Sequence, residues 1–207
     1  MEKIKKLKKH FNKEKIDGYI IPKNDEFFSE YIPEHNDRLN YISNFSGSFG
    51  FALILKNKNY LFVDGRYTLQ AYNQSGKYFK IITIPNKMPS DVLKNKKISI
   101  GFDPKLFTKK TLNIFFGENS CKFKPLTNNL IDNVWKRKIK KSKGGFYKLP
   151  DNSVGLNYKS KINKVVSNLK KKGAYFQFIT ASENNAWLFN IRGYDTKYTP
   201  LPYSHAL

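Results

Sequence analysis

The sequence has little of what marks a disulfide-linked, secreted or membrane-spanning protein. It holds one cysteine, Cys121, among 207 residues, so an internal disulfide is excluded and the cytoplasm is the expected compartment. No apolar run approaches the ~20 residues that cross a bilayer. The first residues, MEKIKKL, are charged where a secretory signal would be apolar. We therefore expect neither a signal peptide nor a membrane partner.

Groups that do chemistry are also scarce. His10, His35 and His205 lie far apart, and none has another histidine or a cysteine at metal-ligand spacing. The sequence contains no Gly-rich phosphate loop, no HExxH helix and no nucleophile elbow. Ser204 precedes His205, but neighbours in sequence do not make a catalytic pair. We expect no catalytic residue and no metal ligand in this chain.

Acidic residues are few, with 16 against 38 lysines and arginines, which gives a net charge of +22. Such a charge is typical of proteins that bind nucleic acid or anionic membranes. The lysines, however, are spread over nearly the whole length, without the clustered basic and aromatic residues of a nucleic-acid module. Lys, Asn, Ile and Phe are abundant together, as AT-rich codon usage produces. We favour that mutational origin over nucleic-acid binding.

What is present is an alternation of short helix and strand patterns, which predicts an α/β fold. Ile4, Leu7 and Phe11 have helical spacing, and the run 19–21 between Gly18 and Pro22 predicts a buried strand. The other predicted elements are a hairpin of strands 51–55 and 60–63, a helix over 66–74 with Leu69 and Tyr72 facing inward, strands over 79–84 and 98–102, and a helix over 108–116 with Thr108 as N-cap.

The C-terminal part of the chain repeats this pattern after a charged, Gly-ending stretch. Residues 1–138 are predicted as a first domain, 139–157 as a linker, and 158–207 as the start of a second domain. Ile162, Val165 and Leu169 repeat the spacing of the first helix, and residues 174–178 are the expected second copy of the first strand. Residues 187–193 repeat 41–47 as aromatic, aliphatic, any, Asn, apolar, any, Gly.

The repeat also predicts how the second copy ends. If Ala206-Leu207 corresponds to Ala52-Leu53, the sequence stops inside a strand whose neighbours are missing. We therefore expect a truncated second domain.

Two local features could carry function. Glu26 and Glu30 are four residues apart in an acidic set with Asp25, Glu34 and Asp37, and would share one face of a helix. A cation site is one reading, but a surface helix paired with lysines is favoured in so basic a chain.

The second feature is Asp64-Gly65-Arg66-Tyr67, at a strand-to-helix junction. Asp64 is placed to cap the helix, and Arg66 carries five donors that suit a carboxylate. From the residues alone, an ordinary salt bridge between Arg66 and Asp64 is favoured over a binding role.

These segments resemble, in order, the first two domains of the three-domain aminopeptidase P enzymes, in the creatinase/prolidase family. The matching segments are Pro22, Asn24-Asp25, Ser29-Glu30-Tyr31-Ile32, Arg38, Phe45-Ser46-Gly47-Ser48, Asp64-Gly65-Arg66-Tyr67 with Leu69-Gln70-Ala71, Gly101-Phe102-Asp103-Pro104, Asn129 to Trp135, and Ala186 to Asp195.

The resemblance implies a mixed sheet flanked by helices, followed by a truncated second copy. It also implies a missing catalytic domain, which holds two divalent metals, usually manganese, and cleaves the N-terminal residue before proline. This chain would then bind no cofactor itself, shape access for a proline-containing peptide, and support a homodimer. The Arg of the family's Asp-Gly-Arg-Tyr motif contacts substrate, which makes Arg66 the candidate substrate-binding residue. The alternative is a stand-alone creatinase-like binding module without peptidase activity.

Overall fold

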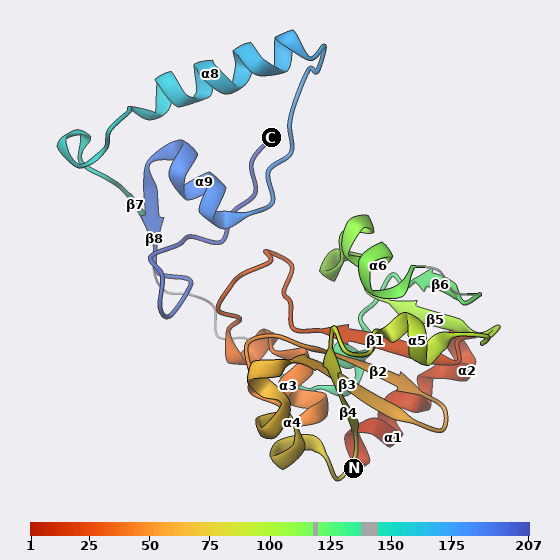
Figure 1. Cartoon of the computed structure of the whole chain (residues 1–207). Coiled ribbons are helices and arrows are strands. Elements are labelled where there is room, and N and C mark those ends of the chain that lie inside the picture. Colours follow the sequence, from red (N-terminus) through yellow and green to blue (C-terminus); the bar gives the residue numbers. More distant parts are fainter. Residues whose placement is uncertain (118–119, 138–144) are drawn as a thin grey trace. The chain divides into compact units, whose positions relative to one another are not determined.

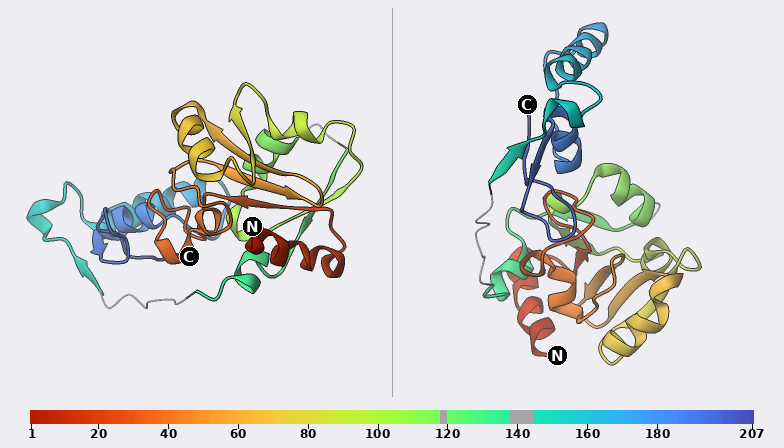
Figure 2. Two further views of the ribbon diagram at one scale, coloured as in Figure 1. Left: turned by 90° about the horizontal axis from the view of Figure 1, so that it is seen from below. Right: turned by 90° about the vertical axis from the view of Figure 1, so that its left-hand side faces the viewer.

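The computed structural model describes residues 1–117, 120–137 and 145–207. The chain divides into two compact units, drawn in Figures 1 and 2. Unit 1 comprises Met1–Asp25 and Glu34–Lys138, and unit 2 comprises Glu26–Pro33 and Ile139–Leu207. No helix in the described parts of the chain combines the length and apolarity of a bilayer span.

Unit 1 is built on a six-stranded mixed sheet with the order β4-β3-β2-β1-β5-β6. Its strands are β1 (Gly18–Pro22), β2 (Phe51–Leu55), β3 (Asn59–Asp64), β4 (Lys80–Ile84), β5 (Ser99–Phe102) and β6 (Lys122–Pro125). The β1–β2 and β2–β3 pairs are antiparallel, and the β3–β4, β1–β5 and β5–β6 pairs are parallel. Every residue of β1 is buried, which explains its continuous apolar sequence.

Helices cover both faces of this sheet, which confirms the predicted α/β fold with a mixed sheet flanked by helices (Figure 1). The helices of unit 1 are α1 (Glu2–Lys8), α2 (His10–Glu14), α3 (Arg38–Ser43), α4 (Thr68–Ser75), α5 (Pro89–Leu93), α6 (Lys109–Phe116) and α7 (Leu130–Val134), with 3-10 turns η1 (Glu34–Asn36), η2 (Gly65–Tyr67) and η3 (Pro104–Leu106).

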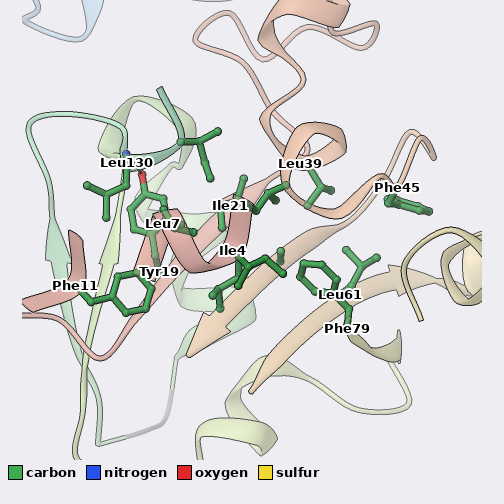
Figure 3. Packing of buried hydrophobic residues seen from close by; sticks show 14 of the residues in the cluster. Ile4, Leu7, Phe11, Tyr19, Ile21, Leu39, Phe45, Leu61, Phe79 and Leu130 are labelled. Carbon is green, nitrogen blue, oxygen red and sulfur yellow. Dashed lines mark hydrogen bonds between the residues drawn. The ribbon is translucent and has the colours of Figure 1, made fainter. Parts of the chain in front are cut away.

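Each face of the sheet has its own apolar core. One core joins α1, α2, α3, α4 and α7 to the sheet, and Figure 3 shows Leu7, Phe11 and Leu61 within it. Tyr19 lies in the same core, where its hydroxyl accepts a hydrogen bond from the Leu130 amide at 3.3 Å. Burial raises the pKa of Tyr19 above its usual range. The other core joins α5, η3 and α6 to the opposite face.

Most predicted elements of unit 1 form, including the hairpin and the N-cap. The side chain of Thr108 accepts a hydrogen bond from the Thr111 amide, as an N-cap does. The predicted inward positions of the helix after β3 are wrong, because Leu69 is 73% exposed and Tyr72 68% exposed. This helix begins only at Thr68, after a 3-10 turn, and buries Ala71 and Ser75 instead.

Unit 2 has less regular structure. Its elements are β7 (Phe146–Lys148), the 3-10 turn η4 (Asp151–Ser153), α8 (Tyr158–Lys171), α9 (Ser182–Phe189) and β8 (Ile191–Gly193). Strands β7 and β8 pair antiparallel, so residues 146–148 of the expected linker are paired strand rather than connector. Residues 138–144 of that stretch lie outside the described part of the chain.

The strand expected over 174–178 does not form. The only strand-like pairing described near it is an isolated antiparallel bridge between Ile179 and Ala206. In unit 1, β1 has a ladder because β2 and β5 flank it. A strand needs such neighbours to satisfy its backbone groups, and one bridge does not supply a ladder.

The predicted repeat is present in tertiary contacts as well as in sequence. Asn44 ends α3 and Asn190 ends α9, both in the left-handed conformation, with φ of 65° and 54°. Asparagine tolerates this conformation better than other side chains with a Cβ. The shared Asn of the two segments is therefore a helix C-cap in both copies.

A lysine from the preceding helix reaches this helix end in both units. Lys3 Nζ donates to the Tyr41 carbonyl at 2.9 Å, and Lys161 Nζ donates to the Trp187 carbonyl at 2.7 Å. Each ammonium also lies over the aromatic ring of that same residue, at 4.5 Å and 4.2 Å from the centroid. Burial lowers the pKa of Lys161. The two units therefore share one packing arrangement of first and second helix.

Candidate functional site

The turn after β3 places Arg66 at the surface of unit 1. β3 ends at Asp64, η2 follows, and α4 starts at Thr68. The Asp64 side chain accepts a hydrogen bond from the Arg66 amide at 3.0 Å and so caps this turn. The cap fixes the backbone from which the Arg66 side chain emerges.

Asp64 also holds the guanidinium of Arg66. Arg66 Nε lies 3.2 Å from both Asp64 oxygens, and Nη2 lies 2.7 Å from Oδ2. This pair confirms the salt bridge that the residues alone favoured. Its hydrogen bonds lower the pKa of the Asp64 carboxyl and raise the pKa of Arg66. The Arg66 side chain is nevertheless 71% exposed, so the outer part of the fork is accessible to a ligand.

The neighbouring loop holds this turn in place. Tyr67 and Ser48 share a hydrogen bond of 2.6 Å between their hydroxyl groups, and the Tyr67 ring packs edge-on to Phe45 at 5.9 Å. A Cβ on Gly47 would lie 2.2 Å from the Phe45 ring and 2.9 Å from Tyr67. Gly47 is therefore required for the close approach of this loop to the Arg66 turn.

The acidic set does not form the expected surface helix. Glu26 and Glu30 lie in turn and bend structure, so no helical face brings them together. Asp37 instead caps α3 through the Asn40 amide and pairs with Lys23 Nζ at 2.5 Å, both side chains being largely buried. Among the described residues, no group of three or more His, Cys, Asp or Glu side chains could hold a metal ion.

A partly buried ionic network in unit 1 was not predicted from the sequence. Asp132 accepts from Arg38 Nε and Nη2 at 2.9 Å each, and from Arg137 Nη2 at 2.9 Å. Arg137 also donates to the His35 carbonyl at 3.0 Å and to Asn36 Oδ1 at 2.8 Å. Arg38 is 1% exposed. Arg38 and Asp132 both lie in segments that carry the family resemblance, so the sequence marked each of them as notable. That the two side chains form a pair is visible only in the folded structure.

The remaining candidates take packing roles. His205 belongs to unit 2, where its ring stacks on Phe27 at 5.0 Å and lies tilted against Phe178 at 5.6 Å between ring centroids. Ser204 Oγ donates to the Pro202 carbonyl, so the structure does not pair Ser204 with His205. Cys121 Sγ lies 3.2 Å from the Lys96 carbonyl, and burial raises the pKa of its thiol.

The architecture and the capped Arg66 turn define an α/β protein built from a repeated unit, in which the first copy presents a surface arginine. The family model described as "Creatinase/Prolidase N-terminal domain" matches residues 3–134, and a second model of that description matches residues 137–207. The chain therefore belongs to the creatinase/prolidase N-terminal domain family.

Its relatives are named as peptidases. The chain is 31% identical over 212 residues to "Probable Xaa-Pro aminopeptidase P" of Coprinopsis cinerea, covering 97% of this chain and 34% of the relative. It is 31% identical over 201 residues to "Aminopeptidase P1" of Lotus japonicus, covering 93% and 30%. The chain thus spans about a third of the length of these relatives.

A solved structure has the same fold over nearly the whole chain. It is the X-prolyl aminopeptidase from Caenorhabditis elegans, described as a cytosolic enzyme with a di-nuclear active site. The TM-score is 0.86 at 29% identity, covering 99% of this chain and 36% of that one. The recognised family and the fold class of the chain are therefore confirmed.

Proposed function

We propose that this chain is the N-terminal part of a metal-dependent Xaa-Pro aminopeptidase, which removes the residue that precedes proline at a peptide N-terminus. The observation that carries the proposal is the similarity to named Xaa-Pro aminopeptidases over 97–99% of the chain. In the proposed enzyme, residues 1–138 are the first domain and 158–207 the beginning of the second, to which strand β7 of the expected linker also belongs. These domains shape access for the peptide and support a homodimer in the cytoplasm.

The two divalent metals of this chemistry, proposed to be manganese, do not fit the residues present. The described residues offer no cluster of three candidate ligands, whereas a two-metal site needs carboxylate and imidazole ligands that converge on both ions. In the proposed enzyme, the metals are held by a catalytic domain outside these 207 residues. No catalytic step is assigned to a side chain of this chain.

Arg66 is the proposed substrate-binding residue. Its guanidinium is charged at all working pH values, its turn is capped by Asp64, and its side chain is 71% exposed. Asp64 fixes one edge of the fork, so binding a peptide carbonyl or carboxylate costs less side-chain entropy than it would for a free arginine. Both features favour a charge-assisted hydrogen bond to peptide.

The test of Arg66 uses a longer protein that joins this chain to the family's catalytic domain. Arg66→Ala is expected to lower kcat/KM on an Xaa-Pro peptide by the equivalent of about 1–3 kcal/mol. Arg66→Lys keeps the charge but loses the fork, so an intermediate loss is expected. Arg192→Ala, in unit 2, is the matched control for loss of one arginine. An unchanged kcat/KM in Arg66→Ala would refute the substrate-binding role and leave Arg66 only its salt bridge to Asp64.

The 207 residues alone are expected to show no hydrolysis of an Xaa-Pro peptide with added manganese. The measurement is product release followed by chromatography, with the longer protein as the positive control. Turnover by the 207 residues, lost on chelation, would refute the assignment of the metals to another domain.

A further inference from the structure

The fold gathers lysines from separate parts of the sequence at one edge of the unit 1 sheet. Strands β1, β3, β4, β5 and β6 start at this edge because they run parallel to one another, and β2 ends there because it runs antiparallel to them. We call this surface the starting edge, and it comprises residues 13–18, 55–59, 76–80, 94–99 and 120–122. Its lysines are all exposed, and they are Lys13, Lys15, Lys56, Lys58, Lys77, Lys80, Lys94, Lys96, Lys97 and Lys122.

The two edges of this sheet differ in charge. The carboxylates of the starting edge are Glu14 and Asp17, and Asp17 is paired with Lys56 at 2.7 Å. At the opposite edge, cations and carboxylates are mixed at or directly after the strand ends, as Lys23, Asp25, Asp64, Arg66, Lys87, Asp103 and Lys105. The sequence alone favoured a mutational origin of the positive charge. A codon bias acts on all surface positions alike, so it does not explain this difference between the edges.

Two turns of the starting edge form one groove. Lys56 and Lys58, between β2 and β3, and Lys96, before β5, line a common groove of about 360 Å³. Asp17 joins the two turns, because its carboxylate accepts hydrogen bonds from Lys56 Nζ at 2.7 Å and from the Ser99 amide at 3.0 Å. Among the described residues, neither Lys58 nor Lys96 is held in an ion pair. Their ammonium groups are therefore available to an anionic ligand.

We propose that the starting edge binds duplex nucleic acid through its phosphodiester backbone, without reading the base sequence. Neighbouring strands lie about 4.8 Å apart, so six strands present their lysines along roughly 24 Å, a length that spans several backbone phosphates. Lysine is a point charge on a flexible stem, which suits phosphates without fixing their geometry. Arg66 lies at the opposite edge, so this surface is separate from the proposed peptide contact.

The exposed side chains favour a duplex over the other polyanions. Single-strand binding depends on bases that stack on aromatic rings. Among the described residues of the starting edge, Tyr78 is the one exposed large aromatic, and Lys77 Nζ lies over its ring at 5.7 Å. A membrane surface is held by apolar side chains that enter the bilayer as well as by charge. Apart from Tyr78, the described part of this edge exposes no large apolar side chain.

The test measures binding of the 207-residue chain to a fluorescent DNA duplex of about 20 base pairs by anisotropy, at several salt concentrations. With about four to six phosphate contacts, log K is expected to fall with log salt at a slope of about −4 to −5. Affinity should then drop by about 10²–10³ between 50 and 200 mM salt. Duplexes of unrelated sequence should bind within about threefold of one another, because phosphate contacts carry no sequence information.

The edge variant replaces four exposed lysines of the starting edge by glutamine: Lys58→Gln, Lys94→Gln, Lys96→Gln and Lys97→Gln. It leaves the Asp17–Lys56 pair intact, so urea unfolding is expected to be unchanged. Its Kd for the duplex is expected to rise about tenfold or more at 100 mM salt, and its salt slope to shrink by about 2–4.

The matched control removes the same charge outside the starting edge, and its substitutions are Lys87→Gln, Lys105→Gln, Lys109→Gln and Lys110→Gln, all at exposed positions. Its Kd is expected to change by less than about threefold, with the salt slope kept. Equal losses in the two variants would overturn the proposal, because net charge alone would then explain binding. No binding of the duplex at 100 mM salt would also overturn it. So would binding to phosphatidylserine vesicles that the edge variant loses, without binding to the duplex, because the surface would then belong to a membrane.

Discussion

The ionic network at Asp132 gives the sharpest prediction about unit 1. The substitution is Asp132→Asn, which keeps the shape of the side chain and removes its charge. Arg38 is 1% exposed and directs two hydrogen bonds of 2.9 Å at the two Asp132 oxygens, and Arg137 adds a third. An asparagine turns one of those oxygens into a donor that faces an arginine N–H. The variant therefore leaves charged donors poorly compensated in a buried place.

The size of the effect follows from these contacts. Removing one partner of a fully buried pair costs about 3–5 kcal/mol. The Asp132 side chain is 29% exposed, so solvent relieves part of this cost. We expect Asp132→Asn to lower the free energy of unfolding of unit 1 by about 2–4 kcal/mol.

Two tryptophans make the assay selective. Trp135 lies in unit 1, where it stacks on Tyr41 at 4.7 Å, and Trp187 lies in unit 2. In a Trp187→Phe background, urea unfolding followed by fluorescence reports unit 1 through Trp135. The control is Asp151→Asn, which removes an exposed pair with Lys148 and is expected to change stability by less than about 0.5 kcal/mol. A midpoint for Asp132→Asn equal to that of the control would refute the reasoning.

Three further predictions concern single positions of unit 1, each measured by urea unfolding in the same background. Ala71→Leu is expected to lower the free energy of unfolding by about 1–3 kcal/mol because Ala71 is fully buried, whereas Leu69→Ser should change it by less than about 0.5 kcal/mol. Equal effects of the two substitutions would contradict the observation that α4 buries Ala71 and exposes Leu69. Asn44→Val is expected to lower the free energy of unfolding by about 1–2 kcal/mol, because φ is 65° at this exposed helix end. Asn44→Gly is expected to leave the stability nearly unchanged. No loss of stability in Asn44→Val would argue against the left-handed helix cap. Hydrogen bonds from Lys56 and the Ser99 amide lower the pKa of Asp17 in the folded state. The ionised Asp17 therefore stabilises the fold above the unfolded-state pKa of about 3.9, and this stabilisation is lost as pH falls through the lower folded-state pKa. Asp17→Asn should therefore weaken the fall in stability below pH ~4, and an unchanged acid limb would refute this.

The elements of unit 1 were predictable because their signals are local. The run 19–21 between Gly18 and Pro22 is buried strand, the hairpin turn falls at residues 56–58 of the polar run 56–59, and Thr108 caps its helix. The one inward face placed wrongly, at Leu69 and Tyr72, depends on where the helix starts. The 3-10 turn before Thr68 delays that start and shifts every later side chain around the helix.

The same distinction between local and tertiary signals applies to the candidate site. The salt bridge between Asp64 and Arg66 spans two residues, so sequence spacing predicted it. The acidic set failed because i,i+4 spacing has meaning only on a helix, and residues 26–30 form none. The exposure of Arg66, on which its proposed role depends, is a property of the folded surface.

By itself, the sequence determined the α/β class, the order of most elements in unit 1, the internal repeat and the family. These rest on periodicity, turn residues and motifs, which act over a few neighbouring residues. The tertiary structure alone decided that Arg38, Asp132 and Arg137 meet, because hydrogen-bonded partners 94 residues apart leave no local pattern. It also decided that residues 174–178 form no strand, because a strand exists only where neighbouring strands accept its hydrogen bonds.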